Sequence, residues 1–416
     1  MAIAEAYLLR YDAILWVGLG YHTAGIAEFG LEDTLHPSAI TYLLLAVASF
    51  PFIYYLLAIW SALRFFARPH EKMNGFTPPI SILKPVRGLD PDAYENFASF
   101  CKQDYPEYEV VFCVGSLDDP AMPAIEQLQR DFPARRIRVL FGSGRIAAND
   151  KVAKLARLAN EAQHEHLVIN DSDVRVKPDY LRRVIAPLEN PQVGAVTCFY
   201  VSIGEQSFIE NLQTVGMLSD FYAGLLVARE LDGVKFALGP TIATTRTRLA
   251  GFGGYQAIEN RPGDDLLVGR LIAEQGYQIE LSRHIVETVS DYQTLGELLH
   301  KRLRWLVVMR HMRPVGHLGL VFTQGLLWSA IAVLVHPTWA TAAIYFGLYF
   351  TLRITMTWLT GGYGLKQENL WRKMPVVFCW DAFALAMWSA SFLRNTIRWR
   401  GGLYYIRGGE LVPSGE

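Results

Sequence analysis

The chain has 416 residues, of which 51% are hydrophobic and only 19% are charged, against roughly 25% charged residues in a typical globular protein. Its 39 basic and 40 acidic residues give a formal net charge of −1, which argues against a general nucleic-acid-binding surface. The four cysteines lie far apart and form no CxxC pair, so the chain is not a disulfide scaffold. The hydrophobic residues are concentrated in a few long segments.

The first apolar segment follows an N-terminal extension, residues 1–38. Residues 39–63 contain no charged side chain and exceed the ~20 apolar residues needed to cross a bilayer, so we expect a transmembrane helix over 39–64. The segment starts late and has no basic leader, unlike a cleaved signal peptide. Residues 1–38 hold five acids and one base, whereas residues 64–88 hold five bases and one acid. The positive-inside rule then places the middle of the chain in the cytoplasm, where unpaired cysteines are expected.

Three further apolar segments lie near the end of the chain: residues 318–335, 338–360 and 375–393. The first two each predict a spanning helix. The third contains Asp381, whose charge is costly in lipid. Basic residues precede it and also follow it in residues 394–416, which we expect to be a cytoplasmic tail. A single crossing by the third segment is then excluded, and residues 318–393 are predicted to combine transmembrane helices with a re-entrant or interfacial one.

Between residues 77 and 292, short β-rich runs alternate with helical patterns. The strand candidates are residues 80–83, 109–114, 136–141, 166–170, 193–201 and 235–244. This alternation is typical of βαβ units, so we expect an α/β domain with a mostly parallel sheet. In such sheets ligands bind outside the carboxyl ends of the strands, which directs the search for functional residues.

Paired acidic residues follow a strand candidate or begin a helix at three places: Asp118 and Asp119, Asp171 and Asp173, and Asp264 and Asp265. An aspartate in such a position commonly caps a helix or closes a turn. We favour that interpretation for Asp264, which precedes the helical run LLVGRLIAEQ. The pair Asp171 and Asp173 differs, because two carboxylates at i and i+2 after a buried strand would face the same cleft.

The carboxylates of Asp171 and Asp173 would repel each other unless a cation lay between them. Mg²⁺ is commonly bound by one or two carboxylates together with substrate phosphates, so the pair indicates a divalent cation and a diphosphate ligand. No GxxxxGK[ST] or GxGxxG motif opens the first βα turn, which leaves phosphate binding by a glycine loop unsupported. In the loop 142–151, Asn149 and Lys151 are candidate ligand contacts, with plain solvent exposure as the alternative.

Residues 293–317 are expected to form an interfacial helix. Its sequence LGELLHKRLRWLVVMRHMRP mixes five bases with Leu, Val, Met and Trp directly before an apolar segment, which is typical of an amphipathic helix drawn to anionic lipid. Lys301 and Trp305 lie one turn apart. Arg304 has a second expected role, because a fixed cation near a departing diphosphate would stabilise its negative charge.

Seven blocks in this order carry a family resemblance: ILKPVRGLDP, DYPEYEVVFCVGSLDDPA, NDSDVRVKPDYL, FALGPTIATTRTRLAGFGGY, GDDLLVGRLIAEQGY, KRLRW and IRWRGGLYYIRGG. The chain resembles the ceramide glucosyltransferases, membrane-bound GT-A enzymes of family 21, and the bacterial relatives that glycosylate hopanoids. The likeness runs from about residue 82 to residue 409. It implies a GT-A domain over residues 77–292.

The resemblance also implies roles for the carboxylates. Asp119 matches the family's first aspartate, which contacts the nucleoside. Asp171 leads the motif that binds the metal and the diphosphate, with Asp173 as its second carboxylate. Asp265 matches the presumed general base, and Asp264 lies beside it in the substrate site.

The last motif of the family reads (Q/R)xxRW, and Arg304 and Trp305 match its final two positions as catalytic residues. Lys301 stands where the family has Gln or Arg, which keeps a cation in the substrate site but loses a planar hydrogen-bonding fork.

The implied reaction is direct displacement. A UDP-sugar binds with its diphosphate on Mg²⁺ or Mn²⁺, and Asp265 accepts the proton of a primary lipid hydroxyl as that hydroxyl attacks the anomeric carbon. The metal and Arg304 stabilise the departing UDP, and the product is a β-glycoside. The acceptor is a ceramide or a hopanoid polyol, and the donor sugar is left open. The resemblance and the charge pattern imply a multi-pass protein of the bacterial inner membrane with its catalytic domain in the cytoplasm.

Two other functions remain as alternatives. A processive polysaccharide synthase shares the aspartates and the RW motif, but it would need more spanning helices than the three expected here. A non-catalytic membrane scaffold would have the same fold, but retention of all the carboxylates argues against it.

Overall fold

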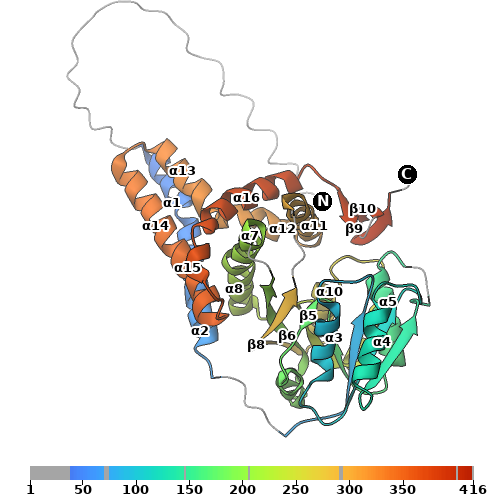
Figure 1. Ribbon diagram of the computed structural model, residues 1–416. Helices are drawn as coiled ribbons and strands as arrows, with labels where there is room; N and C mark the ends of the chain where they lie inside the picture. Colours follow the sequence, from blue (N-terminus) through green and yellow to red (C-terminus); the bar gives the residue numbers. More distant parts are fainter. Residues whose placement is uncertain are drawn as a thin grey trace, which may run out of the picture.

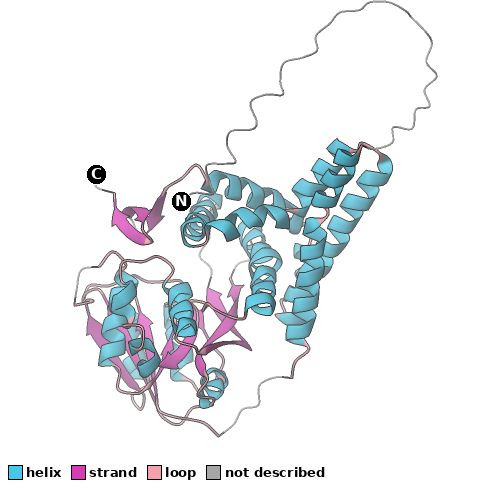
Figure 2. Ribbon diagram, turned by 180° about the vertical axis from the view of Figure 1, so that it is seen from behind, coloured by secondary structure: helices cyan, strands magenta, loops and turns pink. Residues whose placement is uncertain are grey.

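The computed structural model describes residues 38–69, 75–144, 147–204, 207–289, 294–399 and 402–414. A sheet-based domain is joined to a group of long helices, and a small second sheet lies near the C-terminus (Figures 1 and 2). All but the last residue of the predicted N-terminal extension, 1–38, lies outside the described residues.

The main sheet has eight strands in the order β3-β2-β1-β4-β7-β6-β8-β5. They are β1 (Ile80–Pro85), β2 (Tyr108–Val114), β3 (Arg136–Phe141), β4 (His166–Ile169), β5 (Val174–Arg175), β6 (Val193–Ile203), β7 (Ile242–Thr245) and β8 (Gln278–Val289). Strand β1 pairs in parallel with β2 and β4, β2 with β3, and β6 with β8. Strand β7 runs antiparallel to β4 and β6, and β5 antiparallel to β8. The predicted α/β domain with a mostly parallel sheet is confirmed.

Helices cover both faces of this sheet. They are α3 (Ala93–Cys101), α4 (Met122–Asp131), α5 (Asp150–Glu161), α6 (Tyr180–Ile185), α9 (Arg246–Ala250), α10 (Asp264–Glu274) and the 3₁₀ turns Ala186–Glu189 and Tyr255–Ile258. In β1, Ile82 packs with α3, α4 and α6 on one face, and Leu83 packs with α5 and α10 on the other. Burial on both faces explains why β1 is mostly apolar, with Ser81 and Lys84 as its polar residues. All four cysteines are free thiols, as expected.

The sequence-predicted strand at 235–244 is wrong over most of its length. Only Ile242–Thr245 forms a strand, and the residues before it form an irregular loop. Pro240 lies in that loop and has no N–H to donate to a sheet ladder, which is the physical reason why the strand begins after it.

The helical group contains α1 (Ala39–Ala48), α2 (Phe50–Phe66), α7 (Phe208–Gly216), the π-helix η2 (Met217–Phe221), α8 (Tyr222–Asp232), α11 (Leu295–Met312), α12 (Pro314–Gly319), η4 (Leu320–Thr323), α13 (Gly325–Val335), α14 (Trp339–Trp358), the π-helix η5 (Leu359–Gly364), α15 (Leu370–Lys373) and α16 (Val376–Ser391). Helices α7 and α8 leave the sheet after β6 and pack against α16 and α2. Phe199 of β6, Phe65 of α2 and Trp380 of α16 share one apolar cluster. The sheet domain is therefore fixed to the helical group by a common core.

Helices α1 and α2 together form one 28-residue helix, Ala39–Phe66, which is long and apolar enough to cross a membrane. Its exposed side chains Ile53, Leu56, Trp60 and Leu63 are spaced three or four residues apart and so form one apolar stripe. The predicted span at 318–335 is a pair of helices, Pro314–Thr323 and Gly325–Val335, bent by 60°. These two helices meet the criterion of length and apolar composition only when they are counted together as one broken span.

The predicted span at 338–360 corresponds to the 20-residue helix α14, which is not among the described helices that meet the criterion of length and apolar composition, and its crossing of a membrane stays a prediction. Its Arg353 is buried and pairs with Asp381 of α16 and, at 2.6 Å, with Asp220 of η2. Tyr349 also donates to Asp381 at 2.7 Å. The two charges that interrupt the apolar segments thus neutralise each other inside the protein. α16 is a 16-residue apolar helix, and its re-entrant or interfacial position stays a prediction.

Replacing Arg353 by methionine should lower the free energy of unfolding by roughly 3–5 kcal/mol, because Asp381 would remain as a buried, unpaired charge. The double variant R353M/D381L removes both charges and should recover most of that loss. Denaturant unfolding of the detergent-solubilised protein measures both values. Equal stability of the wild type and R353M would show that the pair does not hold α14 to α16.

The predicted basic tail, 394–416, forms a three-stranded antiparallel sheet of β9 (Thr396–Trp399), β10 (Gly402–Arg407) and β11 (Glu410–Pro413). Ile397 and Leu411 pack against Val307 of α11. The N–H of Leu411 donates to the carbonyl oxygen of Asn260 at 2.7 Å. This sheet therefore joins α11 to the main domain, a contact that the sequence did not predict.

Candidate functional site

Several acidic and basic side chains meet at one edge of the main sheet, where β1, β2, β4, β6 and β8 end and β7 begins. Asp171 lies just after β4, and Gly239 lies shortly before β7. Asp264 is the first residue of α10. The rule that ligands bind at the carboxyl ends of parallel strands therefore selects the correct edge.

Lys151, in the first turn of α5, connects two of the predicted carboxylates. Its Nζ lies 2.6 Å from Asp171 Oδ1 and 3.0 Å from Asp264 Oδ2. Burial lowers the pKa of Lys151, but Asp171, Asp264 and Asp265 raise it by more, so the net shift is upward. Gly263 occupies the N-cap position of α10, so the expected capping role of Asp264 is wrong. Asp264 instead binds this lysine.

Asp265 is held in a fixed orientation at the start of α10. Its Oδ2 accepts a hydrogen bond from the N–H of Gly239 at 3.0 Å, and its Oδ1 accepts one from the N–H of Leu266 at 2.8 Å. A carboxylate is favoured in the first turn of a helix, where unpaired N–H groups create partial positive charge. Burial and the neighbouring Asp264 nevertheless raise the pKa of Asp265 above its ordinary value. The side chain is therefore oriented and is more basic than a free aspartate.

Gly239 separates the carboxylates of Asp171 and Asp265. A methyl group at this position would lie 3.0 Å from Asp171 Oδ2 and 3.3 Å from Asp265 Oδ2, closer than ordinary van der Waals contact. A side chain at this position would therefore displace at least one of the two carboxylates.

Replacing Gly239 by alanine should lower turnover by roughly tenfold, because a carboxylate must move by a few tenths of an ångström and a shift of about 1 Å at a reacting group can cost about 100-fold. The thermal unfolding midpoint should change little, since the methyl group meets the ends of side chains and no backbone atom. Steady-state kinetics and thermal unfolding measure the two effects. Gly347→Ala is the matched control, because nothing lies within 4 Å of the added methyl group there. Unchanged turnover in G239A would contradict this spacing role.

A cavity of about 360 Å³ is lined by Asp173 together with Asp90, Lys301 and Trp305. Burial and the carboxylates of Asp171 and Asp90 raise the pKa of Asp173 above its ordinary value. Burial lowers the pKa of Lys301 to about 8, although Asp173 opposes this shift. One cavity therefore brings together three of the site residues predicted from the sequence: Asp173, Lys301 and Trp305.

The predicted metal ligands Asp171 and Asp173 have the right chemistry for a hard divalent cation. Within the described ranges, no group of three His, Cys, Asp or Glu side chains is arranged to hold a metal alone. Mg²⁺ needs only one or two carboxylates when substrate phosphates complete its shell, so the donor set fits a cation that binds together with a diphosphate. Burial is the main cause of the upward pKa shift of Asp173, and repulsion from Asp171 adds to it; a bound cation would relieve that repulsion.

Lys84 is a site residue that sequence reasoning missed. It is completely buried at the end of β1, and its Nζ donates to the carbonyl oxygen of Asp171 at 3.0 Å. Its ammonium also lies 3.5 Å from the centre of the Phe100 ring. Burial lowers the pKa of Lys84 to about 7, against the opposing effect of Asp173 and Asp171. Its signal in the sequence is a lysine that directly follows the strand candidate at residues 80–83.

Two predicted substrate contacts lie at the margin of this cluster. Asp119 follows β2 and accepts hydrogen bonds from the N–H of Gly88 and of Ala121, each at 3.1 Å. Asn149 is buried, caps α5 through Val152, and donates to the carbonyl oxygen of Arg261 at 3.2 Å. The alternative of plain solvent exposure is therefore wrong for Asn149, but its side chain is engaged within the protein.

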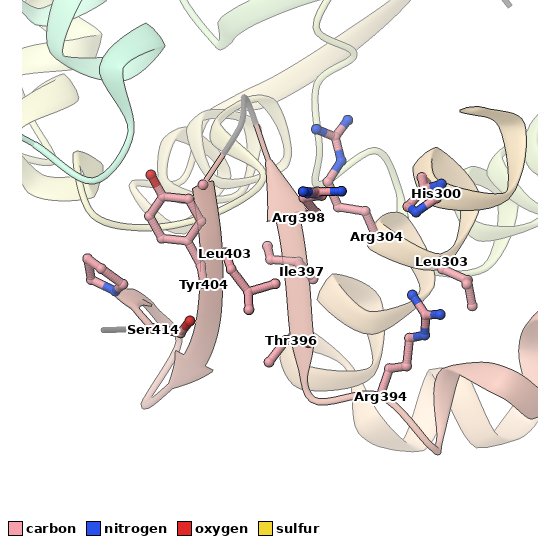
Figure 3. A pocket seen from close by; sticks show the side chains of 12 residues that line it. His300, Leu303, Arg304, Arg394, Thr396, Ile397, Arg398, Leu403, Tyr404 and Ser414 are labelled. Atoms are coloured by element: carbon pink, nitrogen blue, oxygen red, sulfur yellow. The ribbon is translucent and has the colours of Figure 1, made fainter. Parts of the chain in front are cut away.

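Arg304 does not line the Asp173 cavity. It lines a second cavity of about 770 Å³ between α11 and the sheet β9–β10, together with His300, Arg394 and Arg398 (Figure 3). No acidic side chain is among the described residues that line it. The helix α11 thus presents Lys301 and Trp305 to one cavity and Arg304 to another, and the second one is strongly positive.

Comparison with protein families gives one match over most of the chain. The model of glycosyl transferase family 21 matches residues 43–412. This range includes all ten of the predicted site residues.

Two curated relatives in Caenorhabditis elegans match over long stretches. Ceramide glucosyltransferase 3 is 22% identical over 391 residues, which cover 89% of this chain and 83% of that protein. Ceramide glucosyltransferase 1 is 23% identical over 338 residues, which cover 79% of this chain and 69% of that protein.

One solved structure shares the fold over most of its length. It is a mannosyltransferase from Pyrobaculum calidifontis in complex with GDP-Man and Mn²⁺, with a TM-score of 0.53 and 19% identity. The alignment covers 83% of this chain and 98% of that structure. At this identity the likeness concerns the fold alone.

Proposed function

Because the chain belongs to glycosyl transferase family 21, we propose that it transfers a hexose from a UDP-sugar to a primary hydroxyl of a membrane lipid, with inversion at the anomeric carbon. It is a hexosyltransferase with the GT-A fold, as its sequence predicts. A lipid acceptor agrees with the relatives named above, which are ceramide glucosyltransferases.

The observation that carries this proposal is the arrangement of Asp171, Lys151 and Asp265 around Gly239. The carboxylates of Asp171 and Asp265 both come within 3.3 Å of one position, the methyl group that Gly239 lacks. Asp171 has the chemistry to bind a metal and a diphosphate, and Asp265 is oriented as a base. A donor and an acceptor can therefore meet at this edge of the sheet.

In the proposed reaction Asp265 accepts the proton of the lipid hydroxyl while that oxygen attacks the anomeric carbon. The new bond joins oxygen to the anomeric carbon, and the bond between that carbon and the UDP oxygen breaks. Asp265 does not move during this step, because two backbone N–H groups hold its oxygens. The product is a β-glycoside and UDP.

The remaining site residues bind and position the donor. A divalent cation held by Asp171 and Asp173 would supply Lewis-acid stabilisation of the departing diphosphate. Lys151 adds a fixed positive charge between Asp171 and Asp264. We propose that Arg304 contributes positive charge from its own cavity and that Asp119 contacts the nucleoside.

The helical group would hold this site at a membrane surface. We propose that Ala39–Phe66 anchors the protein through its exposed apolar stripe, and that the sheet domain lies on the cytoplasmic side, where nucleotide-sugars occur. We propose that the protein resides in a bacterial inner membrane. The bent pair of helices, Pro314–Thr323 and Gly325–Val335, would form a second membrane segment.

Purified protein in lipid nanodiscs, supplied with Mg²⁺ or Mn²⁺ and a panel of UDP-sugars, tests this function. The acceptors are ceramide and bacteriohopanetetrol, and the mass of the product is measured. We expect the addition of one hexose or hexose derivative to a lipid. Formation of a long glycan from UDP-sugar without a lipid acceptor would instead identify a polysaccharide synthase.

A further inference from the structure

The cavity beside Asp173 connects the reactive edge of the sheet to the helical group. Asp173 and Lys301 are among the residues that line it. One wall comes from α7 and η2, with Gln213, Met217 and Leu218. Those two elements pack against α16, α14 and η5, so this wall belongs to the helical group.

Gln213 is the clearest sign that the cavity accepts a polar ligand. Its side chain is 7% exposed, and its Oε1 has no hydrogen-bond partner among the described residues. A buried carbonyl oxygen without a hydrogen-bond donor is destabilising. Because Gln213 lines the cavity, a ligand with a hydroxyl or amide group can form a hydrogen bond with its side-chain amide.

The cavity also has an apolar surface next to Gln213. Met217 and Leu218 lie at the start of the π-helix η2, and Val201 and Val289 come from the ends of β6 and β8. A π-helical turn is rare and is frequently found at functional sites. The wall therefore suits a ligand whose polar group is attached directly to an apolar body.

The volume and the position of the cavity limit what the ligand is. About 360 Å³ is at the low end of the ~300–1,000 Å³ typical of small-molecule pockets, which suits a headgroup and not a whole lipid. The apolar remainder of such a molecule would extend along the helical group. That group carries exposed apolar side chains on α2 and, with Trp339, Ile344 and Leu348, on α14.

We propose that this cavity binds the headgroup of the acceptor lipid, a primary alcohol flanked by further hydroxyl or amide groups, through Gln213 and the apolar side chains of Met217 and Leu218. Ceramide and a hopanoid polyol share this chemistry. The inference rests on the proposed function and adds the residues that recognise the acceptor, in a cavity that Asp173 also lines.

Gln213→Leu tests the hydrogen bond. We expect the acceptor KM to rise about tenfold, while the KM for UDP-sugar stays within twofold of the wild type. Gln127→Leu, an exposed glutamine of α4, is the matched control and should change neither value. A rise with either acceptor supports the proposal.

Met217→Trp tests the cavity itself, because the larger side chain would fill it. Transfer to lipid should fall more than 100-fold, whereas the slow release of UDP from UDP-sugar without acceptor should continue at the wild-type rate. Thermal unfolding of both variants shows whether they are folded. Wild-type acceptor KM values in two folded variants would overturn the proposal.

Photolabelling separates this inference from the proposed function. A diazirine analogue of each acceptor should label wild-type peptides that contain α7 and η2, and M217W should prevent the labelling. Labelling there without sugar transfer would reject the proposed function but retain the lipid site. Sugar transfer with labelling only elsewhere would reject the lipid site but retain the function.

Discussion

Replacing Asp265 by asparagine is expected to lower kcat by roughly 10²–10⁴-fold, the usual contribution of a positioned general base. Asparagine has nearly the same shape, and its side-chain oxygen can still accept a hydrogen bond from the N–H of Gly239 or of Leu266. It cannot accept the proton of the attacking hydroxyl. The affinity for UDP-sugar should therefore stay within about threefold, since the base is not proposed to bind the diphosphate.

Turnover is measured as sugar transferred to lipid, and donor affinity by isothermal titration calorimetry with UDP-sugar and Mn²⁺. Asp232→Asn is the matched control, because this aspartate is exposed and pairs only with the nearby Lys235 in the described structure. It should behave as the wild type. If D265N kept wild-type turnover, Asp265 would not be the base.

The second large effect concerns Asp171. Asp171→Asn should lower turnover on the order of 10³-fold, because a catalytic metal contributes several kcal/mol and each 1.4 kcal/mol changes the rate tenfold. Unlike D265N, this variant should also weaken the binding of UDP. The loss has two sources, since Asp171 is proposed to hold the cation and also contacts Lys151 at 2.6 Å.

Calorimetry with UDP, with and without Mn²⁺, distinguishes the two aspartates. For the wild type, chelation of the metal should weaken UDP binding, and added Mn²⁺ should restore it. For D171N, Mn²⁺ should make little difference. Metal-dependent UDP binding of wild-type strength in D171N would place the cation elsewhere.

Much of the sheet domain was predictable because its strands are buried on both faces. Such strands appear in the sequence as largely apolar runs, and β2, for example, was predicted at residues 109–114 and is found, fully buried, at Tyr108–Val114. The π-helix η2 and the pairing of Arg353 with Asp381 were not predictable. They depend on which helices meet in space, which local sequence patterns do not contain.

Part of the candidate site was predictable from the positions of the strand ends. The rest depends on contacts between residues that are distant in the sequence. The carboxyl end of β4 places Asp171 at this edge of the sheet, as the sequence predicts. Asp265 lies in the first turn of α10, so its approach to Asp171 depends on the loop that precedes this helix. Gly239 and Lys84 were missed, because their roles follow from contacts with distant residues. Arg304 was predicted, but the folding of the tail into β9 and β10 places it in a second, positive cavity.

The central claim is that this protein attaches a sugar to a lipid hydroxyl by a single displacement assisted by Asp265. The anomeric configuration of the product tests it most directly. Wild-type protein is supplied with a UDP-α-sugar and a lipid acceptor, and the coupling constant of the anomeric proton is measured by NMR on the purified product. The account predicts one sugar in β-linkage to the primary hydroxyl. An α-linked product would contradict direct displacement.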